Sequence, residues 1–310
     1  MELKHNYLTG EWVLVSPGRL ARPNSFKAVR GNPVDEKGLC PFCPENSFMI
    51  LKYIYKSPCG RVAIVPNRYP AISEMSANGP GAHDVVIETP NHSERLAFFS
   101  QKDIYTYLEA IRHRVFELSQ DSGIKYIQVF KNEGQKGGAS IYHSHSQILA
   151  MPIIPIKQAI INSNFEQYHK ENSKCYLCSI TENLGNLMVF ENNLFAAYSP
   201  YASNYAYGLN IAPKKHISDF KDFDKAHLIA LAEVFHKVLP AYCKLFDNFS
   251  YNICFQNAPY NKKQGYNHFF IEIVPRMGQL AGFELSTGCF INPVDVYLAA
   301  SEIRGLIDEN

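Results

Sequence analysis

The sequence has little of several features that would assign a protein to a special class. Its 310 residues carry a formal net charge of only +1, so it lacks the basic excess of proteins that bind nucleic acid or anionic membranes. No tract is of low complexity, and the longest stretch that could suggest a membrane span, residues 136–157, contains two histidines and two prolines. The first residues show no apolar signal segment. We therefore expect a cytoplasmic protein without a membrane or nucleic-acid partner.

The chain is nevertheless rich in apolar residues, which make up 46% of its positions, enough for one large core or two of about 150 residues each. Two strand-like runs that end in asparagine, at 126–132 and 251–257, lie 125 positions apart. Nearly the same spacing relates two pairs of histidines, His143 with His268 and His92 with His216. A constant offset over much of the chain indicates an internal duplication.

The duplication extends to the pattern of secondary structure. Apolar residues recur at helical spacing over 104–118 and again over 228–242, and Ser100 predicts the cap of the earlier helix. Several segments before, between and after these helices have the residue pattern of β-strands. We therefore expect an α+β protein of two similar tandem halves, residues 1–156 and 157–310. Its sheet should be mainly antiparallel, with the helices packed on one face.

Two Cys-x-x-Cys pairs, one in each half, have the spacing that lets both sulfurs bind one zinc ion. Together with the repeated histidines they complete two Cys₂His₂ sets, which are Cys40, Cys43, His92 and His143, and Cys175, Cys178, His216 and His268. Four protein ligands leave zinc no open position, so we expect two structural zinc ions per chain. The alternative is a single Cys₄ site shared by both pairs, which leaves the repeated histidines unexplained. His83 is a reserve ligand.

The two halves differ beside the last histidine of each set. The first half continues from His143 as HSHSQ, whereas the second continues from His268 as HFFIE. Alternate residues of a strand share a face, so His143, His145 and Gln147 should form a row. A metal at His143 would anchor the strand and present His145 rigidly. The equivalent Phe270 has no acid, base or nucleophilic chemistry, so we expect the first half alone to be catalytic.

A glycine-rich loop at residues 132–140 precedes this row. Its small residues let backbone N–H groups approach an anion closely, although it lacks the ending of a Walker loop. Next to a presented histidine, such a loop favours attack on phosphorus. A neutral imidazole is a competent nucleophile, and the amides would stabilise charge that develops on the phosphoryl oxygens.

The pattern N-x-G…G-A-S-x-x-H-x-H-x-Q over residues 132–147 resembles the active-site signature of the galactose-1-phosphate uridylyltransferase family, within the histidine-triad superfamily. The resemblance covers nearly the whole chain, including RLARP at 19–23, NRYP at 67–70 and TPNH at 89–92. The second Cys₂His₂ set and the run at 282–293 are most similar to the ADP-glucose phosphorylase branch of that family.

This resemblance implies that both tandem halves are histidine-triad-like, and it implies a ping-pong nucleotidyl transfer. His145 attacks the α-phosphorus of a nucleotide sugar such as UDP-glucose or ADP-glucose, and sugar 1-phosphate leaves. A phosphate acceptor, such as galactose 1-phosphate, then removes the nucleotide from the histidine. The resemblance also implies a homodimer. The implied contacts are Gln147, Asn132, Gly138 and Ser140 to the phosphates, Arg19 and Arg22 as phosphate-contacting arginines, Asn67 to the nucleoside, and Glu284 to the sugar hydroxyls.

The chain departs from the family pattern around the sugar. A glutamine expected six positions after Glu284 is Phe290, and a lysine expected six before it is Gly278. These changes concern galactose 1-phosphate as the acceptor, and an ADP-sugar phosphorylase that uses inorganic phosphate is the alternative. Hydrolases of the superfamily carry a third histidine where this chain has Gln147, so a hydrolase is disfavoured. A silent nucleotide-binding module would not need His145.

Overall fold

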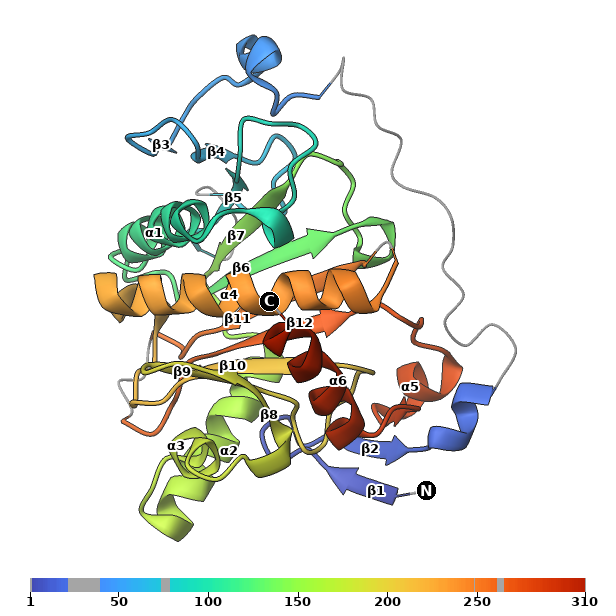
Figure 1. The fold of residues 1–310 in the computed structure, drawn as a ribbon. Helices are drawn as coiled ribbons and strands as arrows, with labels where there is room; N and C mark the ends of the chain where they lie inside the picture. Colours follow the sequence, from blue (N-terminus) through green and yellow to red (C-terminus); the bar gives the residue numbers. More distant parts are fainter. Residues whose placement is uncertain (1, 22–39, 74–78, 248, 261–264, 310) are drawn as a thin grey trace.

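The computed structural model describes residues 2–21, 40–73, 79–247, 249–260 and 265–309. Its centre is a ten-stranded sheet in which every neighbouring pair of strands is antiparallel (Figure 1). In order across the sheet the strands are β3 (Tyr55–Lys56), β4 (Ala63–Pro66), β5 (Ala82–Ile87), β7 (His145–Met151), β6 (Tyr126–Glu133), β11 (Tyr251–Gln256), β12 (Phe270–Pro275), β10 (Leu209–Pro213), β9 (Phe195–Tyr198) and β8 (Met188–Glu191).

The strand order is mirrored about the central pair β6 and β11. Reading outward from β6 gives β7, β5, β4 and β3, and reading outward from β11 gives β12, β10, β9 and β8. Each half therefore contributes five strands in the same sequence of connections, as a duplicated chain requires. Antiparallel pairing of β6 with β11 joins the halves into one continuous sheet. The exact boundary between residues 156 and 157 stays a prediction.

The hydrogen-bond register corrects the alignment of the repeat by one residue. Lys131 pairs with Ser146 in the first half, and Phe255 pairs with Ile271 in the second. Ile271 stands 125 positions after Ser146, so the counterpart of Lys131 is Phe255 at an offset of 124, and not Gln256. Because a shift of one residue exchanges the two faces of a strand, the similar letters at 126–132 and 251–257 misassigned the faces.

Three helices cover one face of the sheet: α1 (Gln101–Leu118), α4 (Lys225–Leu245) and α6 (Val296–Asp308). α1 begins where expected, because the hydroxyl oxygen of Ser100 accepts the backbone N–H of Asp103. Their apolar faces enclose the main core together with inward residues of both halves of the sheet. Figure 1 shows α1 and α4 side by side across the sheet.

Two further helices, α2 and α3, pack against the opposite face of the sheet. Ile161 and Phe165 of α2 (Ile156–Asn172), with Leu177 of α3 (Tyr176–Thr181), pack against Ala196 and Phe270. The neighbouring strand residues, Ala197 and Ile271, belong to the core beneath α4. The prediction of helices on one face therefore holds for α1, α4 and α6 but not for α2 and α3.

A second, three-stranded sheet joins the two ends of the described chain. It consists of β1 (Glu2–His5), β2 (Trp12–Val15) and β13 (Phe290–Asn292), with β2 and β13 parallel. The turn η1 (Pro17–Ala21) follows β2, and the short helix α5 (Gly282–Thr287) precedes β13. Further 3-10 turns are η3 (Pro44–Met49), η4 (Leu96–Phe98), η5 (Gln135–Gly137), η6 (Gly185–Leu187) and η7 (Phe220–Asp222). Among the described helices, none combines the length and apolar character needed to cross a bilayer.

Candidate active site

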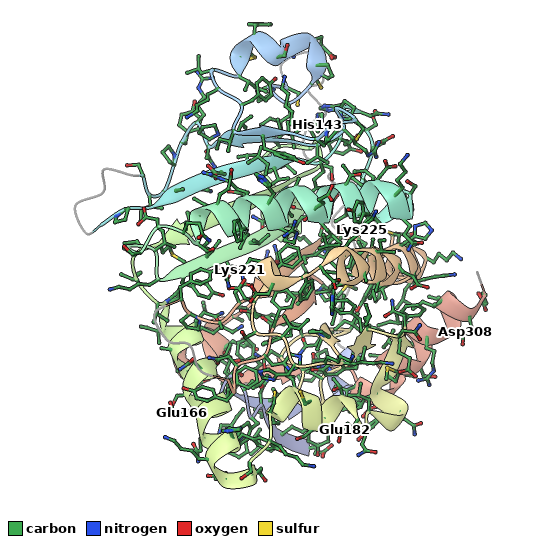
Figure 2. The ribbon with its side chains drawn as sticks, turned by 90° about the vertical axis from the view of Figure 1, so that its left-hand side faces the viewer. His143, Glu166, Glu182, Lys221, Lys225 and Asp308 are labelled. Carbon is green, nitrogen blue, oxygen red and sulfur yellow. The ribbon has the colours of Figure 1, made fainter. Side chains whose placement is uncertain are left out.

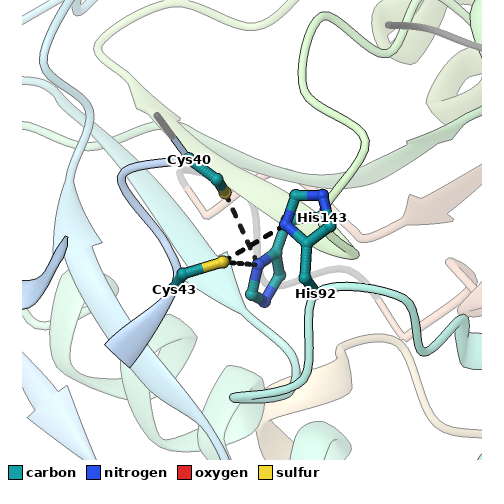
Figure 3. Close-up of side chains that lie close together, drawn as sticks. All are labelled: Cys40, Cys43, His92 and His143. Carbon is teal, nitrogen blue, oxygen red and sulfur yellow. Dashed lines mark hydrogen bonds between the residues drawn. The ribbon is translucent and has the colours of Figure 1, made fainter. Parts of the chain in front are cut away.

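The first Cys₂His₂ set comes together as one buried cluster (Figure 3). The Nδ1 atom of His143 lies 3.6 Å from the sulfurs of both Cys40 and Cys43, and Nδ1 of His92 lies 3.2 Å from the sulfur of Cys43. Ligand atoms on a tetrahedral zinc ion with ordinary bond lengths lie about 3.6 Å apart from sulfur to nitrogen. The four side chains therefore have a spacing and donor set that suit zinc.

The outer nitrogen of the terminal histidine is occupied in the same way in both halves. Nε2 of His143 donates to the carbonyl of Thr89 at 2.7 Å, and Nε2 of His268 donates to the carbonyl of Pro213 at 2.9 Å. A proton on Nε2 leaves the lone pair on Nδ1, the atom that faces the sulfurs. Such backbone acceptors fix the tautomer and ring orientation of metal-binding histidines.

The second Cys₂His₂ set also comes together, with sulfur to Nδ1 distances of 3.3 Å for Cys175 to His268 and 3.8 Å for Cys178 to His216. It is less enclosed, since His216 is exposed and both cysteines are only half-buried. Figure 2 places His143 near one end of the molecule, whereas Glu182, just after α3 and its Cys178, is near the other. A Cys₄ site shared by the two pairs is therefore excluded.

His145 begins β7, two residues after His143 of the first cluster. Its Nδ1 donates to the carbonyl of His143 at 2.8 Å, so the lone pair of the neutral ring is on Nε2. The ring is only 6% exposed and lies 5.4 Å from the ring of Phe42, on the loop that carries the first cysteines. Burial lowers the pKa of His145 and favours the neutral imidazole.

A fully buried ionic network lies beneath β7, on the face away from His145. The Lys131 ammonium donates to both carboxylate oxygens of Glu88, at 3.0 and 3.1 Å, and to the His145 carbonyl at 3.2 Å. The Ser144 hydroxyl donates to Glu88 at 2.6 Å, and the Ser146 hydroxyl also donates to Glu88. Both neighbours of His145 and its own carbonyl are thus held by one charged pair. Sequence reasoning missed this network, because nothing in the alternating pattern marks a lysine as buried.

A second carboxylate, Glu133, completes the charge balance of the network. It lies 3.2 Å from the Lys131 ammonium and accepts from Nε of Arg95 at 2.9 Å. Burial opposes the charge on Lys131, but Glu88 and Glu133 raise its pKa above the usual value. Burial also opposes the charge on Glu133, yet Lys131 and Arg95 hold its pKa below the ordinary range. Lys131 and Glu133 therefore stay ionised near neutral pH.

Gln147 lies on the same face as His145, two residues along β7. Its side-chain oxygen is 2.7 Å from Nε2 of His83, a residue of β5. The Asn67 amide nitrogen lies 3.2 Å from the same ring nitrogen. The predicted nucleoside residue Asn67 and the predicted phosphate residue Gln147 are therefore brought together by His83. His83 itself belongs to neither metal cluster of the described chain, so its reserve role as a ligand is wrong.

The glycine-rich loop lies where β6 meets the second half of the sheet. Asn252 of β11 donates to the side-chain oxygen of Asn132 at 2.8 Å and to the Gly137 carbonyl at 2.7 Å. A Cβ on Gly137 would come within 2.8 Å of the Tyr251 carbonyl, which explains the glycine. Gly138 has φ +84°, the left-handed region that glycine tolerates, and both Gly138 and Ser140 are exposed.

A cavity of about 410 Å³ opens on the same face, across the joint of the two halves. Asn132 and Phe130 of β6 line it on the side of His145 and Gln147, and Asn252, Glu272 and Lys157 line it from the second half. Lys157 is partly exposed and lies 3.5 Å from the Glu272 carboxylate, whose negative charge raises the lysine pKa. The cavity offers room for a polar ligand beside Asn132.

Two predicted substrate contacts, Arg19 and Glu284, are not at this site within a single chain. Arg19 is in η1 and Glu284 is in α5, both at the three-stranded sheet, far from β7 in Figure 1. The Glu284 carboxylate accepts the backbone N–H of Ala281 at 3.0 Å and caps α5. Arg22 lies outside the described residues.

An imidazole presented beside a Cys₂His₂ cluster on a duplicated antiparallel sheet defines a histidine-triad-like enzyme of nucleotide transfer. The family described as "Galactose-1-phosphate uridyl transferase, N-terminal domain" matches residues 75–155. An ADP-glucose phosphorylase of Arabidopsis thaliana is 32% identical over 94% of this chain and 89% of the relative. A galactose-1-phosphate uridylyltransferase of Thermotoga maritima is 31% identical over 98% of each chain. The chain belongs to the galactose-1-phosphate uridylyltransferase family.

Solved structures agree with this assignment. The crystal structure of an ADP-glucose phosphorylase from Arabidopsis thaliana with bound ADP-glucose superimposes with a TM-score of 0.89, at 31% identity over 98% of both chains. A uridylyltransferase structure superimposes with a TM-score of 0.79 at 25% identity, over 100% of this chain and 99% of the other. Both named activities are nucleotidyl transfers, and the chain is a nucleotidyltransferase.

Proposed function

We propose that the protein moves a nucleotidyl group from a nucleotide sugar to a phosphate acceptor through a covalent intermediate on His145. The observation that carries this proposal is the tautomer of His145. Its Nδ1 proton is held by the His143 carbonyl, so the lone pair of Nε2 is available on the face shared with Gln147 and the glycine-rich loop. A nucleophile held in place in this way lowers the barrier, because less entropy is lost when the reacting groups come together.

Bond making and breaking balance in two steps. Nε2 of His145 forms a bond to the α-phosphorus as the bond from that phosphorus to sugar 1-phosphate breaks. In the second step an oxygen of the acceptor phosphate bonds to the same phosphorus, and the N–P bond breaks to restore His145. Gln147, Asn132, Gly138 and Ser140 are the proposed donors to the phosphoryl oxygens. Preorganised donors of this kind stabilise charge that develops in the transition state.

The two Cys₂His₂ clusters are the proposed zinc sites, Cys40, Cys43, His92 and His143 in the first half and Cys175, Cys178, His216 and His268 in the second. When bound, zinc would act as a structural cross-link, because each cluster supplies all four ligands. The first cluster would tie the loop of Cys40 and Cys43 to the start of β7, and so hold the strand that presents His145.

We further propose that the active enzyme is a homodimer in which a second copy supplies part of the substrate site. Arg19 and Glu284 are the family's expected contacts to phosphate and sugar, and both lie away from His145 in their own chain. The assignment of these residues to the substrate therefore requires the small sheet of another copy to approach the catalytic row. Oligomeric state and cross-complementation between an H145N chain and an E284A chain test this part.

Two donor and acceptor pairs fit the family. The first is UDP-glucose with galactose 1-phosphate, and the alternative is ADP-glucose with inorganic phosphate. The relatives carry both names at nearly equal identity, 32% and 31%. The phosphorylase is favoured by the replacement of two expected sugar contacts with Phe290 and Gly278. Rates for each donor with each acceptor decide between them.

The decisive experiment is transfer of label from the α-phosphate. Protein incubated with α-labelled UDP-glucose or ADP-glucose should retain label that is labile to acid and stable to base, with release of one sugar 1-phosphate per label. The H145N variant should retain none while its zinc content is unchanged. Wild-type protein that takes label from neither donor would overturn the proposal and favour a nucleotide-binding module. Label that is lost to water faster than to any acceptor would indicate a hydrolase.

A further inference from the structure

His83 contacts both the turn that begins at Asn67 and the side chain of Gln147 on β7. It lies on β5, whose Val85 pairs directly with Gln147, so His83 is the diagonal neighbour of Gln147 on the open face. The backbone N–H of Ala71 donates to Nδ1 of His83 at 3.0 Å, and Nε2 lies 2.7 Å from the Gln147 side-chain oxygen. The Tyr69 N–H donates to Asn67 at 2.9 Å and shapes the same turn.

The direction of these hydrogen bonds follows from elementary chemistry. A backbone N–H can only donate, so Nδ1 of His83 is the acceptor and carries no proton. The proton of the neutral ring is then on Nε2, which donates to the Gln147 oxygen at 2.7 Å. The Asn67 amide nitrogen, 3.2 Å from the same ring nitrogen, can only donate, so this contact is not a hydrogen bond in that tautomer. The Gln147 atom that receives it must be the carbonyl oxygen, because an amide nitrogen cannot accept. The usual ambiguity between the two ends of a glutamine amide is thus removed by Ala71.

The orientation leaves the amide nitrogen of Gln147 as a free donor. Within the described part of the chain, no acceptor lies at hydrogen-bonding distance from that nitrogen. A phosphoryl oxygen beside His145 would be attracted by this NH₂ group and repelled by the carbonyl oxygen of the reversed amide. We propose that His83 is a positioning residue that fixes Gln147 with its NH₂ group toward the reacting phosphate. This inference rests on the proposed function of His145.

The second half of the sheet shows that this arrangement is not a requirement of the fold. Asn210 pairs with Glu272 where Val85 pairs with Gln147, and the residue equivalent to His83 is Gly208. Glu272 instead accepts from Gln256 and Lys157. Strands of the same register therefore form without a histidine at this place, so His83 is free to serve the phosphate site.

Two substitutions separate the role in positioning from the role in packing. In H83Q, the amide nitrogen is near the position of Nε2 and can still donate to Gln147. In H83N, the shorter amide reaches only the position of Nδ1. We expect H83N to slow release of sugar 1-phosphate in a single turnover by about tenfold to a hundredfold, the range for residues that orient a functional side chain. H83Q should recover most of the rate. H113N, a change of an exposed histidine on α1, is the matched control.

A double-mutant cycle tests whether His83 acts through Gln147. Q147A alone should slow the same step by about 10²- to 10³-fold, the usual effect of losing one oxyanion donor. H83N should add almost nothing in the Q147A background, because the group that it orients is gone. Equal losses from H83N and H83Q, or full additivity with Q147A, would overturn the inference and indicate a packing role.

The tautomer can be measured without activity. Long-range proton–nitrogen correlation spectra of the wild-type protein, labelled with nitrogen-15 histidine, should show the proton of His83 on Nε2. A proton on Nδ1 would contradict the argument even if every variant failed to fold. Failure of the proposed function is a different outcome, since the wild-type protein would then take up no label while the His83 tautomer could still be as described.

Discussion

The two halves share one strand order but fill the space beneath the equivalent strands β7 and β12 differently. Under β7 the first half buries Glu88, Lys131, Ser144 and Ser146 as a hydrogen-bonded network. The equivalent positions in the second half are apolar. By the strand register they are Pro213, Phe255, Phe269 and Ile271. Phe255 and Phe269 are completely buried and pack with Phe220 at ring separations of 5.1 and 5.7 Å.

This difference shows what the fold needs and what the chemistry needs. Because a cluster of phenylalanines supports β12 in the same register, an ionic network is not required to build the sheet. Apolar replacements of buried ion pairs are often as stable as the pairs or more stable. The first half nevertheless retains Lys131, whose ammonium contacts the carbonyl of His145 itself. We infer that the network holds the backbone of His145, the proposed nucleophile, and that the proposed metal cluster would hold the same strand through His143.

The difference between the two halves is tested most directly at His145, the proposed nucleophile. H145N should reduce nucleotidyl transfer by about 10⁴- to 10⁶-fold, because the side chain proposed to form the covalent bond is lost. Single-turnover release of sugar 1-phosphate measures the change, and H169N on α2 is the control for loss of a histidine from the non-catalytic half. Residual label on H145N that maps to a peptide of β12 would show that the second half has retained chemistry.

The buried ion pair should dominate the stability of the first half. K131M leaves Glu88 without its cation and should lower the free energy of unfolding by about 3–5 kcal/mol. The double variant K131M/E88L should recover a large part of this loss, since it imitates the apolar filling of the second half. Urea unfolding followed by circular dichroism measures both.

Activity should not recover with stability in that double variant. If the network positions His145, K131M/E88L remains slow in the first half-reaction although it is folded and holds its metal. A matched change in the second half, F255L, should alter stability without changing this rate. A double variant with the wild-type rate would show that the network is only another way to fill the core.

The two metal clusters should differ in how readily they release their ions. All four ligands of the first cluster are buried, whereas His216 of the second is exposed and Cys178 is half-buried. A chelator should therefore remove about one zinc ion per chain in a fast phase and about one in a slow phase. C178S should abolish the fast phase, and C40S the slow phase. A single phase for both ions would contradict the difference in enclosure.

Much of this site is predictable from the chain alone. The ligands of both clusters follow from Cys-x-x-Cys spacing and two repeated histidines, because zinc needs few residues of defined type. His145 and Gln147 follow from strand periodicity beside an anchored His143. The start of α1 at Ser100 follows from local capping chemistry, which depends on residues only three positions apart.

The rest depends on contacts between distant residues. Pairing of β2 with β13 joins the first and last parts of the chain, and no local pattern in either segment indicates the other. The repeat was misaligned by one position at Lys131 because similar letters do not report hydrogen-bond register. His83 is noticeable in the sequence only as a histidine, and its partner Gln147 becomes apparent once β5 and β7 are adjacent.

The smallest expected effect is a difference in acid stability caused by Glu133. Lys131 and Arg95 hold its pKa below the ordinary value in the folded state, against the effect of burial. A carboxyl group with a depressed folded pKa stabilises the protein above its unfolded pKa, and this contribution is lost as the pH falls through the folded pKa. E133Q should therefore lose less stability than the wild type between about pH 7 and pH 3, by roughly 1 kcal/mol. Release of metal at low pH affects both proteins alike, so the difference between their urea midpoints isolates this group. Parallel curves for the two proteins would mean that Glu133 is ionised no more readily in the folded chain than in the unfolded one. The first half would then differ from the second in polarity but not in how its stability depends on pH.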